Sequence, residues 1–259
     1  CSGRGFRWTQ GEGMVELEPL ASGGNRASVI SADGSIIAGF AQGTSGRTPT
    51  KWDGLTTAGE SLTDDFGAQG EVFGISDDGS TLLGRVDMGI SGWLNAVKWV
   101  NGGQPELIGQ GAINPFLYAG NAMDIAGDGT IVGFDSRQGQ RIAWIQPGGE
   151  GDLINFVDYL EGLGAVLPDL HIGIEVCQAI STDGSTIIGH GFQGAWIVTI
   201  ESCAADLNGD GVLDLDDVST FIAGFTGGDP IADLDGNGVF DLSDISAFVA
   251  SFLDGCGVS

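Results

Sequence analysis

Short apolar runs separated by glycine-rich turns dominate the first 200 residues of the chain. In four segments an Asp-Gly dipeptide separates two such runs, at residues 27–39, 72–84, 122–133 and 178–189. Asp-Gly supplies the positive φ angles that a two-residue hairpin turn requires. Each segment is therefore predicted to be a β-hairpin, with the turn carboxylates Asp33, Asp78, Asp128 and Asp183. The glycine that closes each second strand, such as Gly39, indicates close backbone approach or a bulge.

A strand that ends in tryptophan alternates with these hairpins. Five tryptophans recur 44, 47, 45 and 52 residues apart, namely Trp8, Trp52, Trp99, Trp144 and Trp196. A fourth apolar strand follows most of them. Four strands in a period of about 45 residues, with one aromatic anchor each, are typical of a propeller blade. The sequence therefore predicts a mainly β fold, a small β-propeller over residues 1–200.

The predicted strands do not divide evenly into blades. Two strands precede the first hairpin, twelve fill the next three periods and three come last, so that seventeen are expected. Four blades need one strand fewer, and five blades, the alternative, need three more. Both ends carry a tryptophan strand, and the surplus leaves either an irregular blade or a sheet edge that another chain could complete. The last period is lengthened by residues 150–176, in which a short helix is expected at 153–160.

Beyond residue 200 the apolar periodicity becomes helical. Two sets spaced i, i+3, i+4 and i+7 predict two helices whose apolar stripes pack together. The sets are Val218, Phe221, Ile222 and Phe225, and then Ile245, Phe248, Val249 and Phe252. An acidic loop precedes each helix. A second, α-helical domain is therefore predicted over residues 201–259.

Oxygen-bearing side chains occupy positions 1, 3, 5, 9 and 12 of both acidic loops, with glycine at position 6 and a backbone carbonyl at position 7. The predicted ligands are Asp206, Asn208, Asp210, Val212, Asp214 and Asp217 in one loop, and Asp233, Asp235, Asn237, Val239, Asp241 and Asp244 in the other. A hard cation with six to eight oxygen ligands requires this donor set, so two calcium ions are predicted. Acidic surface turns are the alternative, but the two loops match at every ligand position.

The charge distribution agrees with a cation-binding exterior. The net charge is −26, and all nine basic residues lie between Arg4 and Arg141. Such a surface disfavours nucleic acid and anionic lipid as partners. No stretch approaches the roughly 18 consecutive apolar residues of a membrane span.

The cysteines and the first residue indicate an extracellular protein, secreted or associated with a cell surface. The numbering starts at Cys1 rather than at methionine, which we interpret as a mature chain without its leader. Four cysteines predict two disulfides, for which three pairings exist. Cys203 and Cys256 bracket the C-terminal segment and are expected to pair, which leaves Cys1 with Cys177. Acylation of Cys1, as in a bacterial lipoprotein, is the alternative.

The alternation of an Ile-Ser-x-Asp-Gly hairpin with a tryptophan strand, over about residues 4–200, resembles the HAF family of extracellular repeats. That resemblance implies a secreted propeller and no particular activity. Residues 203–256 resemble a type I dockerin, an EF-hand-like domain, of the variety framed by cysteines. Aspartate at loop position 12, in place of glutamate, is typical of dockerin loops. The resemblance implies calcium-dependent attachment to a protein partner: a cohesin-like receptor, a cell-surface component or another copy.

Loop positions 10 and 11 help dockerins to contact a cohesin, and here they are Leu215-Asp216 and Leu242-Ser243. These pairs depart from the Ser-Thr type of that family, which argues against a cellulosomal cohesin. No nucleophile elbow, zinc motif or phosphate-binding glycine loop occurs. His171 and His190 are the only histidines, and His190 occupies a repeat position. Trp93, outside the repeat register, is the candidate for an exposed aromatic contact.

Together these observations predict a non-catalytic secreted structural or adhesive protein. Its dockerin-like tail is expected to make calcium-dependent contacts that build a polymer or a surface layer. The alternative is a propeller that binds polysaccharide and is docked to a cohesin-like scaffold. An enzyme is the third interpretation and is not expected.

Overall fold

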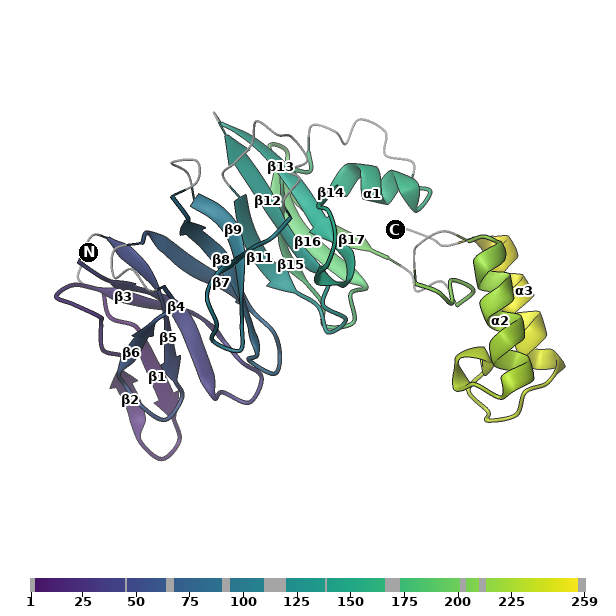
Figure 1. Ribbon diagram of the computed structural model, residues 1–259, viewed down its shortest axis with the longest axis horizontal. Helices are drawn as coiled ribbons and strands as arrows, with labels where there is room; N and C mark the ends of the chain where they lie inside the picture. The colour runs from purple at the N-terminus through teal and green to yellow at the C-terminus, as the bar shows by residue number, and fades with distance from the viewer. Residues whose placement is uncertain are drawn as a thin grey trace. The chain divides into compact units, whose positions relative to one another are not determined.

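The computed structural model describes residues 3–44, 46–63, 68–89, 94–109, 120–137, 139–165, 173–200, 204–209 and 213–255 (Figure 1). The chain divides into two compact units. The first comprises Cys1–Phe156 and Ile172–Ile197, and the second comprises Val157–His171 and Val198–Ser259. The predicted division at residue 200 lies close to the later boundary, whereas the short segment after Phe156 groups with the C-terminal unit.

The first unit is a row of small antiparallel sheets, each formed by consecutive strands of the chain (Figure 1). A two-stranded sheet consists of β1 (Phe6–Thr9) and β2 (Gly13–Glu16). Three four-stranded sheets follow: β3 (Asn25–Ile30), β4 (Ile36–Gln42), β5 (Arg47–Asp53) and β6 (Gly59–Ser61); β7 (Gly70–Ile75), β8 (Thr81–Asp87), β9 (Leu94–Val100) and β10 (Glu106–Leu107); β11 (Gly120–Ile125), β12 (Ile131–Arg137), β13 (Gln140–Gln146) and β14 (Ile154–Asn155). The last sheet has three strands, β15 (Val176–Ile180), β16 (Thr186–Gly191) and β17 (Gly194–Thr199).

Seventeen strands therefore lie within the described parts of the chain, in the groups of two, twelve and three that the sequence predicts. A short 3-10 helix, η1 (Pro147–Gly149), follows β13. The predicted short helix is confirmed as α1 (Phe156–Gly162), which begins three residues later than expected.

The four Asp-Gly hairpins form, but not with the expected two-residue turn. The glycines of these turns take positive φ angles, 74° at Gly34 for example, and Asn101 is the only described residue other than glycine with positive φ. The N–H of Gly34 donates to the carbonyl of Ser31 at 2.9 Å, which gives a four-residue turn. The Asp33 carboxylate accepts the Ser35 N–H at 2.9 Å and the Ser31 hydroxyl at 2.7 Å. These bonds, the one from the Ser35 backbone foremost, lower the pKa of Asp33 to about 2. The turn carboxylates therefore stabilise the turns in which they lie.

The glycines that close the second strands lie where the backbone needs them. A Cβ atom on any of them would overlap a carbonyl oxygen of the paired strand, and the four are Gly39, Gly84, Gly133 and Gly189. The register of each first strand shifts opposite that glycine, for example between Ala27 and Val29. The predicted bulge with close backbone approach is thus confirmed.

The core lies between successive sheets. The first strand of each sheet packs on the preceding sheet: β7 on β3–β5, β11 on β7–β9 and β15 on β11–β13. Trp52, Trp99 and Trp144 are fully buried there. The indole N–H of Trp99 donates at 2.9 Å to the carbonyl of Leu62 in the sheet before it. Tryptophan as a buried anchor is thus confirmed for the three complete sheets. It is wrong for Trp8, which is 64% exposed and is covered by no described sheet.

Cys177 is a buried free thiol on β15 and not the expected half-cystine. Burial raises the pKa of this thiol well above its usual value. The structure thus contradicts the predicted Cys1–Cys177 bond, because the thiol is enclosed between its own sheet and the preceding one. Cys1, Cys203 and Cys256 themselves lie outside the described residues, as do His171 and Trp93. The Cys203–Cys256 disulfide therefore stays a prediction.

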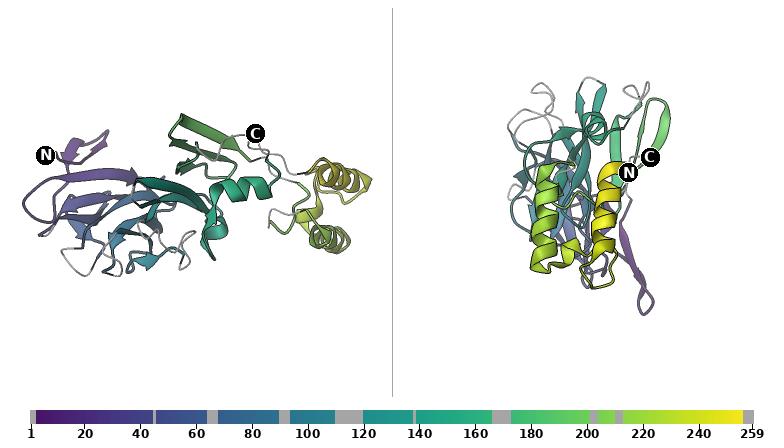
Figure 2. Two further views of the ribbon diagram at one scale, coloured as in Figure 1. Left: turned by 90° about the horizontal axis from the view of Figure 1, so that it is seen from above. Right: turned by 90° about the vertical axis from the view of Figure 1, so that its right-hand side faces the viewer.

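The second unit contains α2 (Leu215–Gly227), the 3-10 helix η3 (Pro230–Ala232) and α3 (Leu242–Asp254) (Figure 2). The rings of Phe221 and Phe248 stack with centroids 4.3 Å apart, so the two predicted stripes do pack together. Ile222 and Val249 face solvent instead, and the buried stripe is narrower than predicted. No helix in the described part of the chain is long and apolar enough to cross a membrane.

Candidate metal centre

The second acidic loop, residues 233–244, gathers three carboxylates. Oxygen atoms of Asp233, Asp235 and Asp244 all lie within 4.8 Å of one another. Asp244 is fully buried, whereas Asp235 is exposed. Like charges at this spacing repel, and the 118 residues after Arg141 contain no lysine or arginine that could neutralise them. The arrangement fits a bound cation, with the carbonyl of Val239 and the side chains of Asn237 and Asp241 as the further predicted donors of the same loop.

Asp244, at loop position 12, also holds the loop together. Its Oδ1 atom accepts the backbone N–H groups of Leu234 at 2.9 Å and Asp235 at 3.4 Å. Its Oδ2 atom accepts the N–H of Asp241 at 2.9 Å. The last of these bonds is the largest cause that lowers the pKa of Asp244, against the opposing effect of burial. The carboxylate is therefore ionised and fixed at neutral pH, ready to serve as a ligand.

The end of each loop is also the beginning of a helix. Asp214 and Asp241, at loop position 9, are the N-cap residues of α2 and α3. Position 12 is the third helical residue, and its carboxylate accepts the N-cap N–H, so both helices begin with a capping box. The sequence predicts these residues only as metal ligands. Their acidic Asp-x-x-Asp spacing before an apolar helix was the available signal for the second role.

The first loop repeats this geometry where it is described. Oδ1 of the fully buried Asp217 accepts the N–H groups of Leu207 at 3.0 Å and Asn208 at 3.3 Å. Oδ2 of Asp217 accepts the N–H of Asp214 at 3.0 Å. Asp206 accepts the N–H of Gly209 at 2.9 Å. The predicted ligands Asp210 and Val212 lie outside the described residues. Both loops thus use their closing aspartate in the same way.

An ion network between sheets was not foreseen from the sequence. The buried carboxylate of Glu71 on β7 pairs with Arg26 on β3, and Arg47 Nη1 lies 3.5 Å from it. One sheet further on, Arg85 donates to the Oδ1 atom of Asn121 at 3.1 Å. Arg26, Glu71 and Asn121 occupy equivalent positions of their first strands, so the repeat register was the available signal. The network connects adjacent sheets, and we interpret its role as structural.

His190 and the remaining buried carboxylates do not form a catalytic arrangement with one another among the described residues. His190 lies on β16 opposite Val176, at the repeat position expected for it. Asp135, whose pKa burial raises to about 7, lies on β12, and Asp124 accepts the backbone N–H of Ile180 from the next sheet at 3.0 Å. His190 therefore lies in a different sheet from Asp124 and Asp135.

No family model matches this sequence, and no curated protein matches it. Among solved structures, the putative TolB from Agrobacterium tumefaciens is 14% identical and aligns over 76% of this chain and 63% of its own length, with a TM-score of 0.50. TolB from Acinetobacter baumannii is 15% identical over 73% of this chain and 44% of its own length, with a TM-score of 0.48. The chain thus spans less than two thirds of either protein. At such identities the first similarity shows the fold alone: this chain is mainly β, of the TolB β-propeller type.

Proposed function

We propose that this chain is a non-catalytic extracellular structural or adhesive protein. Its C-terminal unit binds two calcium ions and makes calcium-dependent contacts with another copy. The observation that carries the proposal is the convergence of Asp233, Asp235 and Asp244 in a loop without any neighbouring basic residue. The first loop has the same closing geometry, which supports a second ion.

The surface of the C-terminal unit supports a protein partner. Each helix exposes an apolar stripe: Leu215 and Ile222 on α2, and Leu242, Val249 and Leu253 on α3. Ser219 and Ser246 lie within the two stripes, and their hydroxyls donate at 2.8 Å to carbonyls of their own helices. The hydroxyl hydrogens of these serines are therefore not available to water. Exposed apolar stripes of this kind mark interaction surfaces.

The link between calcium and these stripes is structural. Leu215 and Leu242 directly follow the N-cap residues that close the loops. An ion bound by a loop would neutralise its carboxylates and hold the start of the helix, and the stripe begins at that point. Calcium is therefore expected to control whether the stripes are presented together.

The alternative of a carbohydrate-binding propeller on a cohesin-like scaffold has less support. Sugars often stack on exposed aromatic rings, and although Trp8 is exposed, the repeat tryptophans Trp52, Trp99 and Trp144 are fully buried. The candidate Trp93 lies outside the described residues.

Sedimentation velocity of the full chain in calcium and in EDTA tests the proposal. We expect calcium to increase the sedimentation coefficient and the weight-average mass, with two ions bound per chain by calorimetry. The matched variant Leu253→Glu, which places a charge on the α3 stripe, should bind both ions and lose the calcium-dependent association. An oligomeric state that is indifferent to calcium would contradict the proposal.

A further inference from the structure

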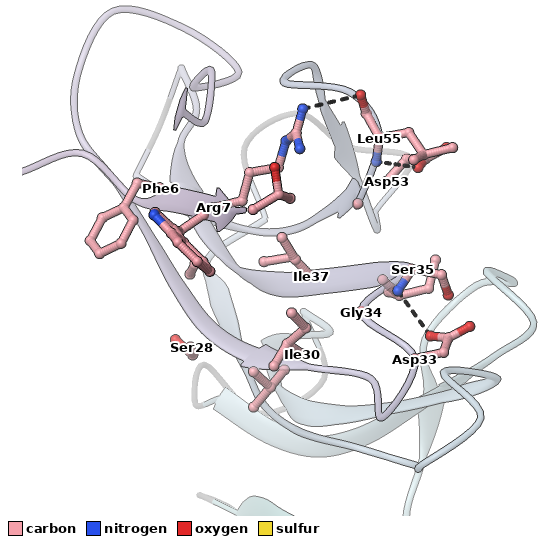
Figure 3. A pocket seen from close by; sticks show the side chains of 16 residues that line it. Phe6, Arg7, Ser28, Ile30, Asp33, Gly34, Ser35, Ile37, Asp53 and Leu55 are labelled. Carbon is pink, nitrogen blue, oxygen red and sulfur yellow. Dashed lines mark hydrogen bonds between the residues drawn. The ribbon is translucent and has the colours of Figure 1, made fainter. Parts of the chain in front are cut away.

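A groove of about 800 Å³ opens on the front of the first complete sheet (Figure 3). We call it the front groove; it is lined by β1 residues such as Phe6 and Trp8, by β3 and β4 residues such as Ile30 and Ile37, and by Leu55. Phe6, Trp8, Ile30 and Leu55 are each at least half exposed. The front groove is therefore an apolar surface that the described part of the chain leaves open.

The groove exists because the sheet β1–β2 is half of a repeat. The N–H of Leu17 donates to Gly5 at 2.9 Å, as Leu62 donates to Pro49 at 3.0 Å one period later. The indole of Trp52 donates to the carbonyl of Glu18 at 2.9 Å, as Trp99 does to Leu62. β1 and β2 thus take the places that β5 and β6 take in a complete sheet. No described strand takes the two inner places, those of β3 and β4, beside β1, and the front groove occupies that position.

The last sheet has the opposite deficiency. β15 and β16 are the two inner strands of this sheet, and its far face has no described neighbour. One residue of the second strand shows the difference: Ala38, Leu83 and Val132 are fully buried by the following sheet, whereas the equivalent Ile188 is 43% exposed. At the other end, Ile30 is 58% exposed, whereas its equivalent Ile180 is only 8% exposed. One end lacks a sheet that the other end presents.

We propose that the front groove of one copy receives the β15–β16 face of a second copy, so that the chains associate head to tail. The contact would repeat the packing that the chain already uses between its own consecutive sheets. That packing joins neighbouring sheets in chain order, and three complete sheets separate the groove from β15–β16 (Figure 1). A contact between two different surfaces joins copies head to tail, and it extends into a filament unless the rotation between copies closes a ring. The inference deepens the proposed self-assembly, on which it rests.

Strand β17 competes with β1 of the other copy for the place beside β16. β1 and β17 are both tryptophan strands and hold equivalent third places, so only one of them can pair with β16 in a completed sheet. β17 is less enclosed than its counterpart β13: Ile197 is 67% exposed, whereas the equivalent Ile145 is 1% exposed. In the assembled state β1 of one copy therefore replaces β17 of the other beside β16.

Two matched variants of the full chain test the interface, Ile30→Glu in the groove and Ile188→Glu on the far face. Sedimentation equilibrium is measured in EDTA as well as in calcium, because no predicted calcium ligand lies in the interface. Each variant alone should weaken association at least about 100-fold, since an unpaired carboxylate would be buried. In EDTA, where the proposed calcium-dependent contact is absent, an equimolar mixture of the two should form a 1:1 dimer and nothing larger, because each variant keeps one intact surface.

The other outcomes overturn the inference. If either variant associates as the wild type does, the groove is not the interface. If the wild type is a monomer in EDTA at all concentrations, the chain closes on itself or leaves its ends free. The control Leu253→Glu alters the α3 stripe and should leave association in EDTA unchanged. If Leu253→Glu abolishes all association while Ile30→Glu does not, the calcium-dependent contact of the proposed function stands and the head-to-tail interface fails.

Discussion

The two units of this chain hold themselves together by different means. The β unit buries large side chains between successive sheets, where Trp52, Trp99 and Trp144 are fully enclosed. The C-terminal unit has a small core around the stacked rings of Phe221 and Phe248 and surrounds it with carboxylates. A unit of fewer than about 80 residues rarely gains enough stability from apolar burial alone. The comparison therefore indicates that packing stabilises the first unit, and under the proposed function bound calcium would add stability to the second.

Trp99→Ala should have the largest effect on stability and should act on the β unit alone. Removing a buried tryptophan costs about 3–5 kcal/mol through lost packing and the cavity that remains. All six tryptophans lie before residue 197, so the remaining fluorescence reports on unfolding of the β unit. The matched change Trp8→Ala removes an exposed ring and should cost less than about 1 kcal/mol. Equal losses would mean that Trp8 is also enclosed in solution.

Asp244→Ala should damage the C-terminal unit and spare the β unit. Three backbone N–H groups lose their acceptor, which costs about 2 kcal/mol without calcium, and the bound stoichiometry should fall from two ions to one. Calorimetry measures the stoichiometry. Asp216→Ala, which removes an exposed carboxylate at loop position 11, should still bind two ions. Unchanged stoichiometry in Asp244→Ala would refute the assigned loop register.

The two units should respond to pH in opposite directions in EDTA. The folded pKa of Asp244 is lowered, so its contribution is present above the unfolded pKa of 3.8 and is lost as the pH falls through the folded value. The folded pKa of Asp135 is raised to about 7, so the β unit should lose stability as the pH rises from 4 towards 7.

Thermal unfolding from pH 3 to pH 8 checks this, with tryptophan fluorescence for the β unit and far-ultraviolet dichroism for the helices. Asp135→Asn should flatten the profile of the β unit and leave that of the helices unchanged. Parallel profiles for the two units would contradict the assignment.

The smallest effect concerns the hairpin turns. Ser76→Ala removes the hydroxyl that donates to Asp78 at 2.7 Å and accepts from the N–H of Thr81 at 2.9 Å. The bond to the Asp78 carboxylate has a charged acceptor but is exposed to water, so its net contribution is about 1 kcal/mol. The third hairpin already carries Ala126 at the equivalent position, so the variant should fold and lose about that amount. Urea unfolding followed by fluorescence measures it, and the control is Ser80→Ala.

Local features were predictable because they depend on neighbours in sequence. The period of the tryptophan strands predicted the number and grouping of the strands. The spacing of the carboxylates predicted an acidic loop before each helix. The turn type was not predictable, because Asp-Gly suits a two-residue turn and only the bonds from Ser31 and Ser35 to Asp33 select the longer one. The capping role of Asp244 required knowledge of where α3 begins.

Sequence by itself determined what each repeat position contains, and tertiary structure decided whether that position is covered. Trp8 and Trp99 occupy the same place in their repeats, yet one is 64% exposed and the other is fully buried. Leu83 and Ile188 differ in the same way. The physical reason is that burial depends on a pair of sheets and not on a single residue, so the sheets at the two ends of the described row keep apolar residues exposed. Ile30 and Ile188 lie on these two faces, where we propose that a second copy binds.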